Sequence, residues 1–232
     1  MLIHSFNHIR EIGDYIFSQF ETEISHTGSI SIALSGGNTP NALFEYWVQQ
    51  YAERMDVWNA INFYWVDERA VPPTDSESNY GTAHSLFFSP LAIPESHIYR
   101  MKGEENTKQE AIRYENLLQK QLPHINNTPR FDFVFLGLGD DGHTASIFPG
   151  QEKTLTQTSQ LCKESINPYT KQERITLTST TINNAKRVFF IILGEQKKEI
   201  FNQVFSTEKT EKKYPAQWIE PKFSEIEILT NI

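Results

Sequence analysis

The sequence has little cysteine, a deficit of positive charge and no long apolar run. A single cysteine, Cys162, in 232 residues excludes an intrachain disulfide framework and a zinc site built from several cysteines. Lysine and arginine number 21 against 29 acidic residues, and the net charge of −8 argues against a nucleic-acid or anionic-membrane surface. No stretch approaches the roughly 18 apolar residues of a membrane span. We therefore expect neither a nucleic-acid partner nor membrane association.

Several other signals are also missing. The first residues have no basic segment leading into an apolar one, which favours a cytoplasmic location. No His-Glu-x-x-His metal motif is present, and a Gly-x-Ser-x-Gly elbow of serine hydrolases is absent. There is no internal repeat and no linker-like change in composition, so residues 1–232 are expected to form one domain. The charged stretch 208–213 is interpreted as a solvated loop or a frayed helix end.

What the sequence contains is an alternation of strand-like and helical segments. Apolar or β-branched runs typical of buried strands occupy 29–34, 61–66, 131–138, 174–178 and 188–193, with a weaker one at 97–101. Apolar residues at helical spacing mark 6–24, 43–51, 106–122 and 200–205. In the third helix, Ile112, Leu117 and Leu118 are expected to face the core, and 225–229 is expected to be an edge strand. The pattern predicts a doubly wound α/β fold: a mostly parallel sheet with helices on both faces.

Polar motifs follow the expected strands, and sheets of this kind bind ligands at the carboxyl ends of their strands. The first motif, Ser-Gly-Gly-Asn-Thr-Pro at 35–40, lies between a strand and a helix. Gly36 and Gly37 allow close backbone approach, and N–H groups at a helix N-terminus attract phosphate. Asn38 or Thr39 is expected to cap the helix. The alternative interpretation is an ordinary capped turn, since the Gly-Lys-Ser/Thr ending of a nucleotide P-loop is absent.

Charged residues form the second motif, Asp67, Glu68 and Arg69, at the end of another strand. A guanidinium there can bind two phosphate oxygens at once, and the carboxylates can orient it. A surface ion pair is the alternative. Arg174 opens a later strand, and Lys197 lies at a strand-to-helix turn. Considered alone, each is more often a solvated cation than a ligand-binding one.

The third motif, Gly-Leu-Gly-Asp-Asp-Gly-His-Thr-Ala-Ser at 137–146, is the longest. Its first part formally matches the dinucleotide pattern Gly-x-Gly-x-x-Gly, but two aspartates would face a pyrophosphate and the match lies in the middle of the chain. We interpret it as a glycine turn that presents His143. An ordinary histidine pKa near about 6.5 suits a general base at neutral pH. The alternative is a histidine that caps a helix or bonds a carbonyl.

Together these motifs resemble those of the 6-phosphogluconolactonase family. The matching segments follow the family's order over nearly the whole chain and are 35–40, 67–72 with Ser78 and Asn79, 141–150, 174–178, Asn184 with Ala185, and Gly194 with Lys197. The resemblance implies a fold shared with glucosamine-6-phosphate deaminase and ribose-5-phosphate isomerase. It implies hydrolysis of 6-phosphoglucono-δ-lactone to 6-phosphogluconate without a metal or cofactor.

The resemblance also implies roles for residues. His143 would be the general base, while Arg69, Arg174 and the loop 36–39 would hold the substrate, chiefly its phosphate. Asp67 and Lys197 resemble catalytic-site residues whose roles are less defined. A lysine ammonium or a backbone N–H of the glycine loop can stabilise the oxyanion that forms as water attacks the lactone.

Some features depart from the family or leave alternatives. Gln217 stands where the family commonly has serine, and the C-terminal tail lacks the family's frequent aromatic-and-aspartate ending. Glucosamine-6-phosphate deaminases typically have Asp-Glu-Tyr where this chain has Asp-Glu-Arg at 67–69, and an Asn-Glu-Pro element that this chain lacks. A non-catalytic sugar-phosphate sensor is the second alternative, although sensing needs the cations and not His143. We expect a monomer or a weak homo-oligomer.

Overall fold

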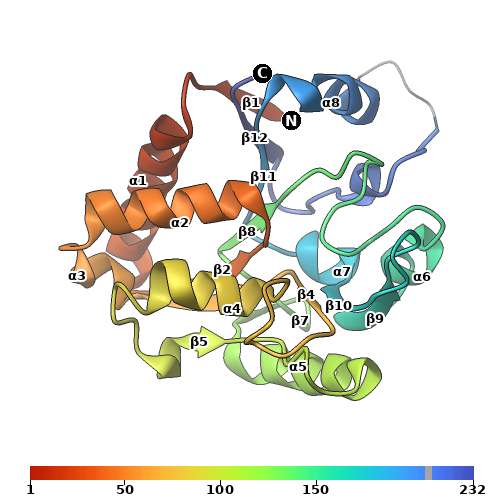
Figure 1. The fold of residues 1–232 in the computed structure, drawn as a ribbon, viewed down its shortest axis with the longest axis horizontal. Coiled ribbons are helices and arrows are strands. Elements are labelled where there is room, and N and C mark those ends of the chain that lie inside the picture. Colours follow the sequence, from red (N-terminus) through yellow and green to blue (C-terminus); the bar gives the residue numbers. More distant parts are fainter. Residues whose placement is uncertain (207–210) are drawn as a thin grey trace.

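The computed structural model describes residues 1–206 and 211–232 (Figure 1). Its central element is a seven-stranded sheet in the order β1-β12-β11-β8-β2-β3-β5, and every pairing between these strands is parallel. The strands are β1 (Leu2–Ser5), β2 (Ile30–Leu34), β3 (Ile61–Trp65), β5 (Ile98–Tyr99), β8 (Phe133–Leu136), β11 (Arg187–Ile192) and β12 (Ile226–Thr230). Of the charged stretch 208–213, residues 208–210 lie outside the described part of the chain and 211–213 are exposed.

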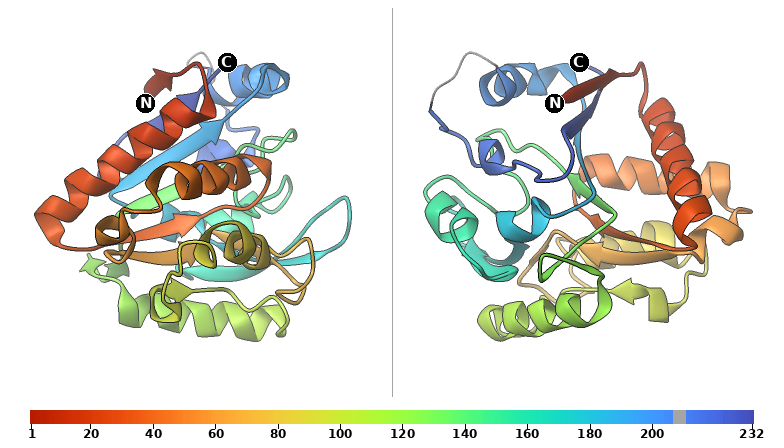
Figure 2. Two further views of the ribbon diagram at one scale, coloured as in Figure 1. Left: turned by 60° about the vertical axis from the view of Figure 1, so that its left-hand side comes forward. Right: turned by 180° about the vertical axis from the view of Figure 1, so that it is seen from behind.

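Helices cover both faces of the sheet, which confirms the predicted doubly wound fold (Figure 2). α1 and α2 pack together on one side, and α5, α6 and α7 lie on the other. The helices, with short 3-10 or π segments labelled η, are α1 (Ile9–Thr27), α2 (Asn38–Tyr51), α3 (Met55–Trp58), α4 (Asn79–Ala83), η1 (His84–Phe88), η2 (Glu95–His97), α5 (Thr107–Gln121), α6 (Glu152–Thr156), α7 (Ser179–Ile182), η3 (Glu195–Lys197), α8 (Lys198–Phe205) and η4 (Pro215–Trp218).

The core lies around β8, which explains the continuous apolar runs in the sequence. Each residue of β8 is buried, because helices cover the strand from both sides. Phe133 stacks on Phe189 of β11 with ring centroids 5.8 Å apart, and Phe20 of α1 meets Phe133 edge-on at 5.5 Å. No helix among the described residues is long and apolar enough to cross a membrane.

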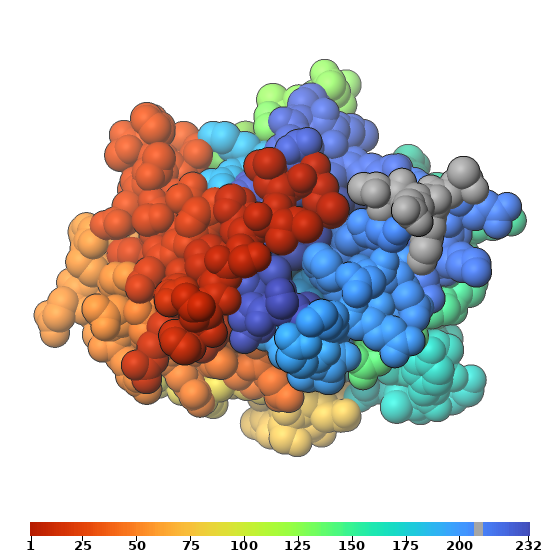
Figure 3. Space-filling model, turned by 90° about the horizontal axis from the view of Figure 1, so that it is seen from above, coloured from red at the N-terminus to blue at the C-terminus, as the bar shows by residue number. Residues whose placement is uncertain are grey.

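The prediction that 225–229 forms an edge strand is wrong. β12 lies between β11 and β1, and β1 forms the edge, so the two ends of the chain run side by side (Figure 3). The alternating pattern misled because Glu227, the polar residue of β12, is buried: it accepts two hydrogen bonds from the Arg187 guanidinium, at 2.7 Å each. The exposed Leu2 and Ile3 at the edge have no periodic pattern that would mark a strand.

One predicted strand belongs to a separate sheet. Residues 173–177 form β10 (Glu173–Leu177), which pairs antiparallel with β4 (Asp67–Arg69) on one side and with β9 (Cys162–Ile166) on the other. We call these three strands the small sheet; it packs against α5. A hairpin of β6 (His124–Ile125) and β7 (Thr128–Pro129) completes the described strands.

The predicted inward face of α5 is partly wrong. Leu118 is fully buried and Leu117 packs partly buried against the core, but Ile112 is 53% exposed. Glu110 takes part in the buried face instead. Its carboxylate accepts from the Lys102 N–H at 2.8 Å and forms an ion pair with Arg113, one turn along the helix. These partners allow a charged residue to be buried in α5 while the apolar Ile112 is exposed.

Candidate active site

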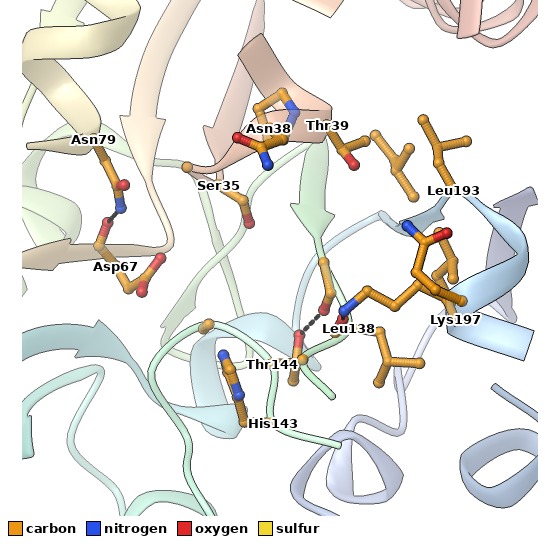
Figure 4. A pocket seen from close by; sticks show the side chains of 18 of the residues that line it. Ser35, Asn38, Thr39, Asp67, Asn79, Leu138, His143, Thr144, Leu193 and Lys197 are labelled. Atoms are coloured by element: carbon orange, nitrogen blue, oxygen red, sulfur yellow. Dashed lines mark hydrogen bonds between the residues drawn. The ribbon is translucent and has the colours of Figure 1, made fainter. Parts of the chain in front are cut away.

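A cavity of about 320 Å³ opens at the carboxyl ends of β2, β3, β8 and β11. It lies where the strand order reverses between β2 and β8, the position at which open α/β sheets bind ligands. Figure 4 shows Asp67 and Asn79 on one side of it and Lys197 on the opposite side. The lining residues that the sequence had singled out are Gly36, Asn38, Thr39, Asp67, Arg69, His143 and Lys197.

The loop after β2 brings backbone close to the cavity. Gly36 lines the cavity, and a Cβ there would overlap the Asn79 side chain, so only glycine fits. Gly37 has φ 101, a left-handed conformation that favours glycine. The predicted cap by Asn38 or Thr39 is wrong, because both are already helical in α2 and the residue before them is Gly37. The first N–H groups of this 14-residue helix remain free of a side-chain cap.

His143 is held by a carboxylate rather than by a carbonyl. Its Nδ1 lies 2.5 Å from Asp141 Oδ1, and its backbone N–H donates to the same oxygen at 3.0 Å. Burial alone would raise the pKa of Asp141. The hydrogen bonds from His143 and the electrostatic attraction of its imidazole outweigh burial and lower the pKa of Asp141 to about 2. An ionised carboxylate only accepts, so Nδ1 carries the hydrogen and the Nε2 lone pair is left to take a proton.

The turn that carries His143 is packed too tightly for larger residues. The imidazole lies against Gly139, where a Cβ would collide with it, and against the Phe148 ring at a centroid distance of 4.6 Å. Gly142 has φ 75 and faces the Tyr214 ring. These contacts leave the imidazole little freedom to turn away from the cavity.

Gln217, which departs from the family pattern, has a local function in the structure. Its Oε1 accepts from the Tyr214 N–H at 2.9 Å and its Nε2 donates to the Val204 carbonyl at 3.0 Å. It thereby ties η4 to α8. The Ala216 N–H of the same segment donates to the Gly142 carbonyl at 3.0 Å, so this C-terminal segment supports the turn before His143.

Lys197 reaches the cavity from η3. Its Nζ donates to the Leu138 carbonyl at 2.8 Å and to Asp140 Oδ1 at 2.6 Å. An ammonium has three donors, so one remains for a ligand. The strand-to-helix turn predicted for Lys197 is confirmed, and the side chain lines the cavity.

Arg69 and Arg174 stand directly opposite each other on β4 and β10. Arg69 lines the cavity and donates to the Glu77 carbonyl at 2.5 Å. Arg174 is 7% exposed, and its Nε and Nη1 have no hydrogen-bond partner among the described residues. Burial and then the Arg69 charge lower the pKa of Arg174. Two like charges in facing positions destabilise a sheet, and an anion bound between the two guanidinium groups would relieve their repulsion.

The two acidic residues of the second motif form no ion pair with the Arg69 guanidinium, although Glu68 accepts from the Arg69 backbone N–H at 2.8 Å. Asp67 is buried, and its carboxylate accepts from Ser146 Oγ at 2.6 Å. Glu68 is buried and accepts backbone N–H groups of Asn79 and Tyr80, each at 2.8 Å. Burial raises the pKa of Glu68 even against these hydrogen bonds. Glu68 therefore anchors the loop that supplies Asn79.

Asp141, Asn79 and Ser146 lie in segments that match the family, but the sequence pattern predicted no individual role for them. Asp141 could have been found from its position two residues before a histidine, a spacing that lets a carboxylate reach Nδ1. Asn79 and Ser146 carried no comparable local signal, since their partners lie far away in the chain. Among the described residues, no three His, Cys, Asp or Glu side chains are grouped to hold a metal ion.

Comparisons with known proteins agree with this geometry. Residues 5–228 match the family described as glucosamine-6-phosphate isomerases/6-phosphogluconolactonase. The 6-phosphogluconolactonase of Treponema pallidum is 36% identical over 203 residues, which cover 88% of this chain and 83% of that protein. That of Haemophilus influenzae is 37% identical over 210 residues, covering 90% and 88%.

A solved structure shows the same arrangement of elements. The chain is similar to the 6-phosphogluconolactonase of Trypanosoma brucei with a TM-score of 0.85 and 27% identity, over 99% of this chain and 95% of that one.

Proposed function

The chain belongs to the family of glucosamine-6-phosphate isomerases and 6-phosphogluconolactonases, and on this premise we propose that it hydrolyses 6-phosphoglucono-1,5-lactone to 6-phosphogluconate. One observation carries the proposal beyond the family name. A buried guanidinium with two nitrogens that lack a partner among the described residues, that of Arg174, stands opposite Arg69 in the strand register. Arg69 lines a cavity that also holds a carboxylate-oriented histidine. The site thus combines a dianion receptor with a base.

The phosphate end of the site is proposed to be the two arginines and the loop after β2. Guanidinium groups bind phosphate oxygens through two parallel N–H donors. The loop 36–39 adds the backbone N–H groups of Gly37, Asn38 and Thr39 at the start of α2, whose dipole favours an anion. Asp67 and Asn79 border this end and keep its walls polar.

The hydrolytic end is proposed to be His143. Its Nε2 takes a proton from a water molecule as the water oxygen attacks the lactone carbonyl, and Asp141 stabilises the resulting imidazolium. The imidazolium then returns the proton to the ring oxygen as the tetrahedral intermediate collapses and the C1–O bond breaks. The free donor of Lys197, or a backbone N–H of the glycine loop, stabilises the oxyanion.

We further propose that residues 1–232 work as one domain, located in the cytoplasm, as a monomer or weak homo-oligomer. One contiguous core of buried residues runs from α1 to β12, which supports the single domain. No metal and no cofactor enter the proposed reaction, since water, base and oxyanion donors suffice for a strained lactone.

The experiment that tests the function is hydrolysis of freshly generated lactone by wild type, His143→Ala and His124→Ala, against a blank without enzyme. The blank is needed because the lactone opens spontaneously. His124 is exposed and lies in β6, away from the cavity, so its removal should leave the rate unchanged. Loss of the base should lower kcat by roughly 10² to 10⁴.

Two results would count against the proposal. An unchanged kcat in His143→Ala would remove histidine from the role of base. Folded wild type with no rate above the blank would contradict lactone hydrolysis altogether and favour the non-catalytic sugar-phosphate sensor. The deaminase alternative is not favoured, because curated relatives over most of the chain are lactonases.

A further inference from the structure

Ser146 makes an unusual set of contacts for one small residue. It is 1% exposed, and each of its three polar groups reaches a different strand of the small sheet. Its Oγ donates to Asp67 Oδ2 on β4 at 2.6 Å, and its N–H donates to Thr176 Oγ1 on β10 at 3.2 Å. Its carbonyl accepts from Ser165 Oγ on β9 at 2.6 Å.

The strand register shows which face of the small sheet Ser146 contacts. Thr176 faces Asp67, while Arg174 faces Arg69 on one side and Ser165 on the other. Residues two apart on a strand point to the same face. Ser146 therefore binds the face from which the two arginines project, directly beside the proposed phosphate site.

The other side of Ser146 is the turn that carries the base. Ser146 follows His143 by three residues, and between them Ala145 has φ 49, a left-handed conformation that is strained for a residue with a Cβ. The Ile147 N–H closes the turn on the Thr144 carbonyl at 3.0 Å. The three hydrogen bonds of Ser146 hold this strained turn against the small sheet.

We propose that Ser146 is a positioning residue that sets the separation between the general base His143 and the phosphate-binding pair Arg69 and Arg174. This inference rests on the proposed function. The substrate must place its lactone carbonyl at the base while its phosphate lies between the arginines, and the two ends sit on different elements of the fold. A displacement of about 1 Å between such groups lowers catalysis roughly 10²-fold.

The test is Ser146→Ala, which removes the contact with Asp67 but retains the side chains of the base and of both arginines. Ser179→Ala is the matched control, because Ser179 is also a buried serine that donates to a carbonyl, but on α7. We expect Ser146→Ala to lower kcat/KM for the lactone about 10- to 100-fold. Ser179→Ala should keep wild-type kinetics.

Binding measurements separate positioning from general damage. Inorganic phosphate occupies the arginine end alone, whereas 6-phosphogluconate engages both ends. Isothermal titration should give Ser146→Ala a Kd for phosphate within about 2-fold of wild type and a Kd for 6-phosphogluconate weakened about 10-fold, since a two-point ligand loses the gain of simultaneous contact. Ser165→Ala, which removes the third-strand contact, should show the same pattern to a smaller degree and serves if Ser146→Ala does not fold.

Each outcome has a distinct meaning. Equal weakening of phosphate and 6-phosphogluconate, or wild-type kcat/KM in the Ser146→Ala protein, would overturn the positioning role. A wild-type protein that binds both ligands but does not hydrolyse the lactone contradicts the proposed function instead, and the difference between the two Kd changes still decides whether Ser146 sets the separation.

Discussion

Two arginines on strands that follow one another in the chain differ in what surrounds them. Arg187 at the start of β11 forms a two-point ion pair with buried Glu227 and also donates to Gln19 Oε1 at 2.7 Å. Arg174 on β10 is more deeply buried, faces another arginine and has two guanidinium nitrogens without a partner among the described residues. The first is satisfied by the protein, and the second is not.

The difference separates a structural charge from a functional one. A buried cation without a partner costs stability, and folding gives no reason to keep it. In Arg187 the Nε, Nη1 and Nη2 groups all donate to the protein already, which leaves little of this guanidinium to bind a ligand. The comparison shows which observation identifies a ligand-binding arginine. It is the presence of guanidinium nitrogens without a hydrogen-bond partner in the protein, and not the residue type or its burial.

The largest expected effect concerns the paired arginine. Arg187→Met should lower the free energy of unfolding by about 3–5 kcal/mol, because buried Glu227 would lose its guanidinium partner and keep only the Tyr15 hydroxyl at 3.2 Å and the His4 imidazole at 3.5 Å. Urea denaturation measures this loss, and kcat at a temperature where the variant stays folded should match wild type. Adding Glu227→Leu should restore most of the stability. If Arg187→Met were as stable as wild type, Arg187 would not be a structural charge.

Arg174→Met should have the opposite profile. Loss of charged hydrogen bonds to the phosphate, about 1.5–3 kcal/mol, predicts a kcat/KM roughly 10- to 150-fold lower, mostly through KM. Its Tm should stay the same or rise, since repulsion from Arg69 disappears. Steady-state kinetics and a thermal scan check both parts. A large fall in Tm would mean that Arg174 is a structural residue after all.

Inorganic phosphate provides a comparison without turnover. Free phosphate at about 100 times its Kd should stabilise wild type by about 2.7 kcal/mol, because only the folded protein binds it. Arg187→Met should keep this increment and Arg174→Met should lose most of it. Urea titration at fixed ionic strength measures the effect. If phosphate stabilised both variants equally, its binding site would not include Arg174.

The smallest expected effect tests a paired carboxylate of the site itself. The folded pKa of Asp141 is lowered to about 2, below an unfolded value near about 4, so its contribution to stability is present above about pH 4 and is lost as the pH falls toward 2. Asp141→Asn should flatten the fall in stability over this window. Unfolding curves between pH 5 and 2 measure it, and identical pH dependence in both proteins would contradict the shift.

The regular part of the fold was predictable because its signals are local. Continuous apolar runs identified β2, β3, β8 and β11, and the loops that follow them hold His143 and Arg69 at one end of the sheet. The small sheet was not predictable as a unit. β4 and β10 pair across about half the chain, and neither strand has a pattern that names its partner.

By itself, the sequence determined the alternation of elements, the edge of the sheet where the loops meet and the residue types gathered there. Only the tertiary structure decided that Arg174 lacks a partner, that Asp141 orients His143 and that Ser146 reaches Asp67, which lies 79 residues away. The physical reason is range. Burial and periodicity are read from neighbouring residues, whereas the satisfaction of a polar group depends on atoms that folding brings from elsewhere in the chain.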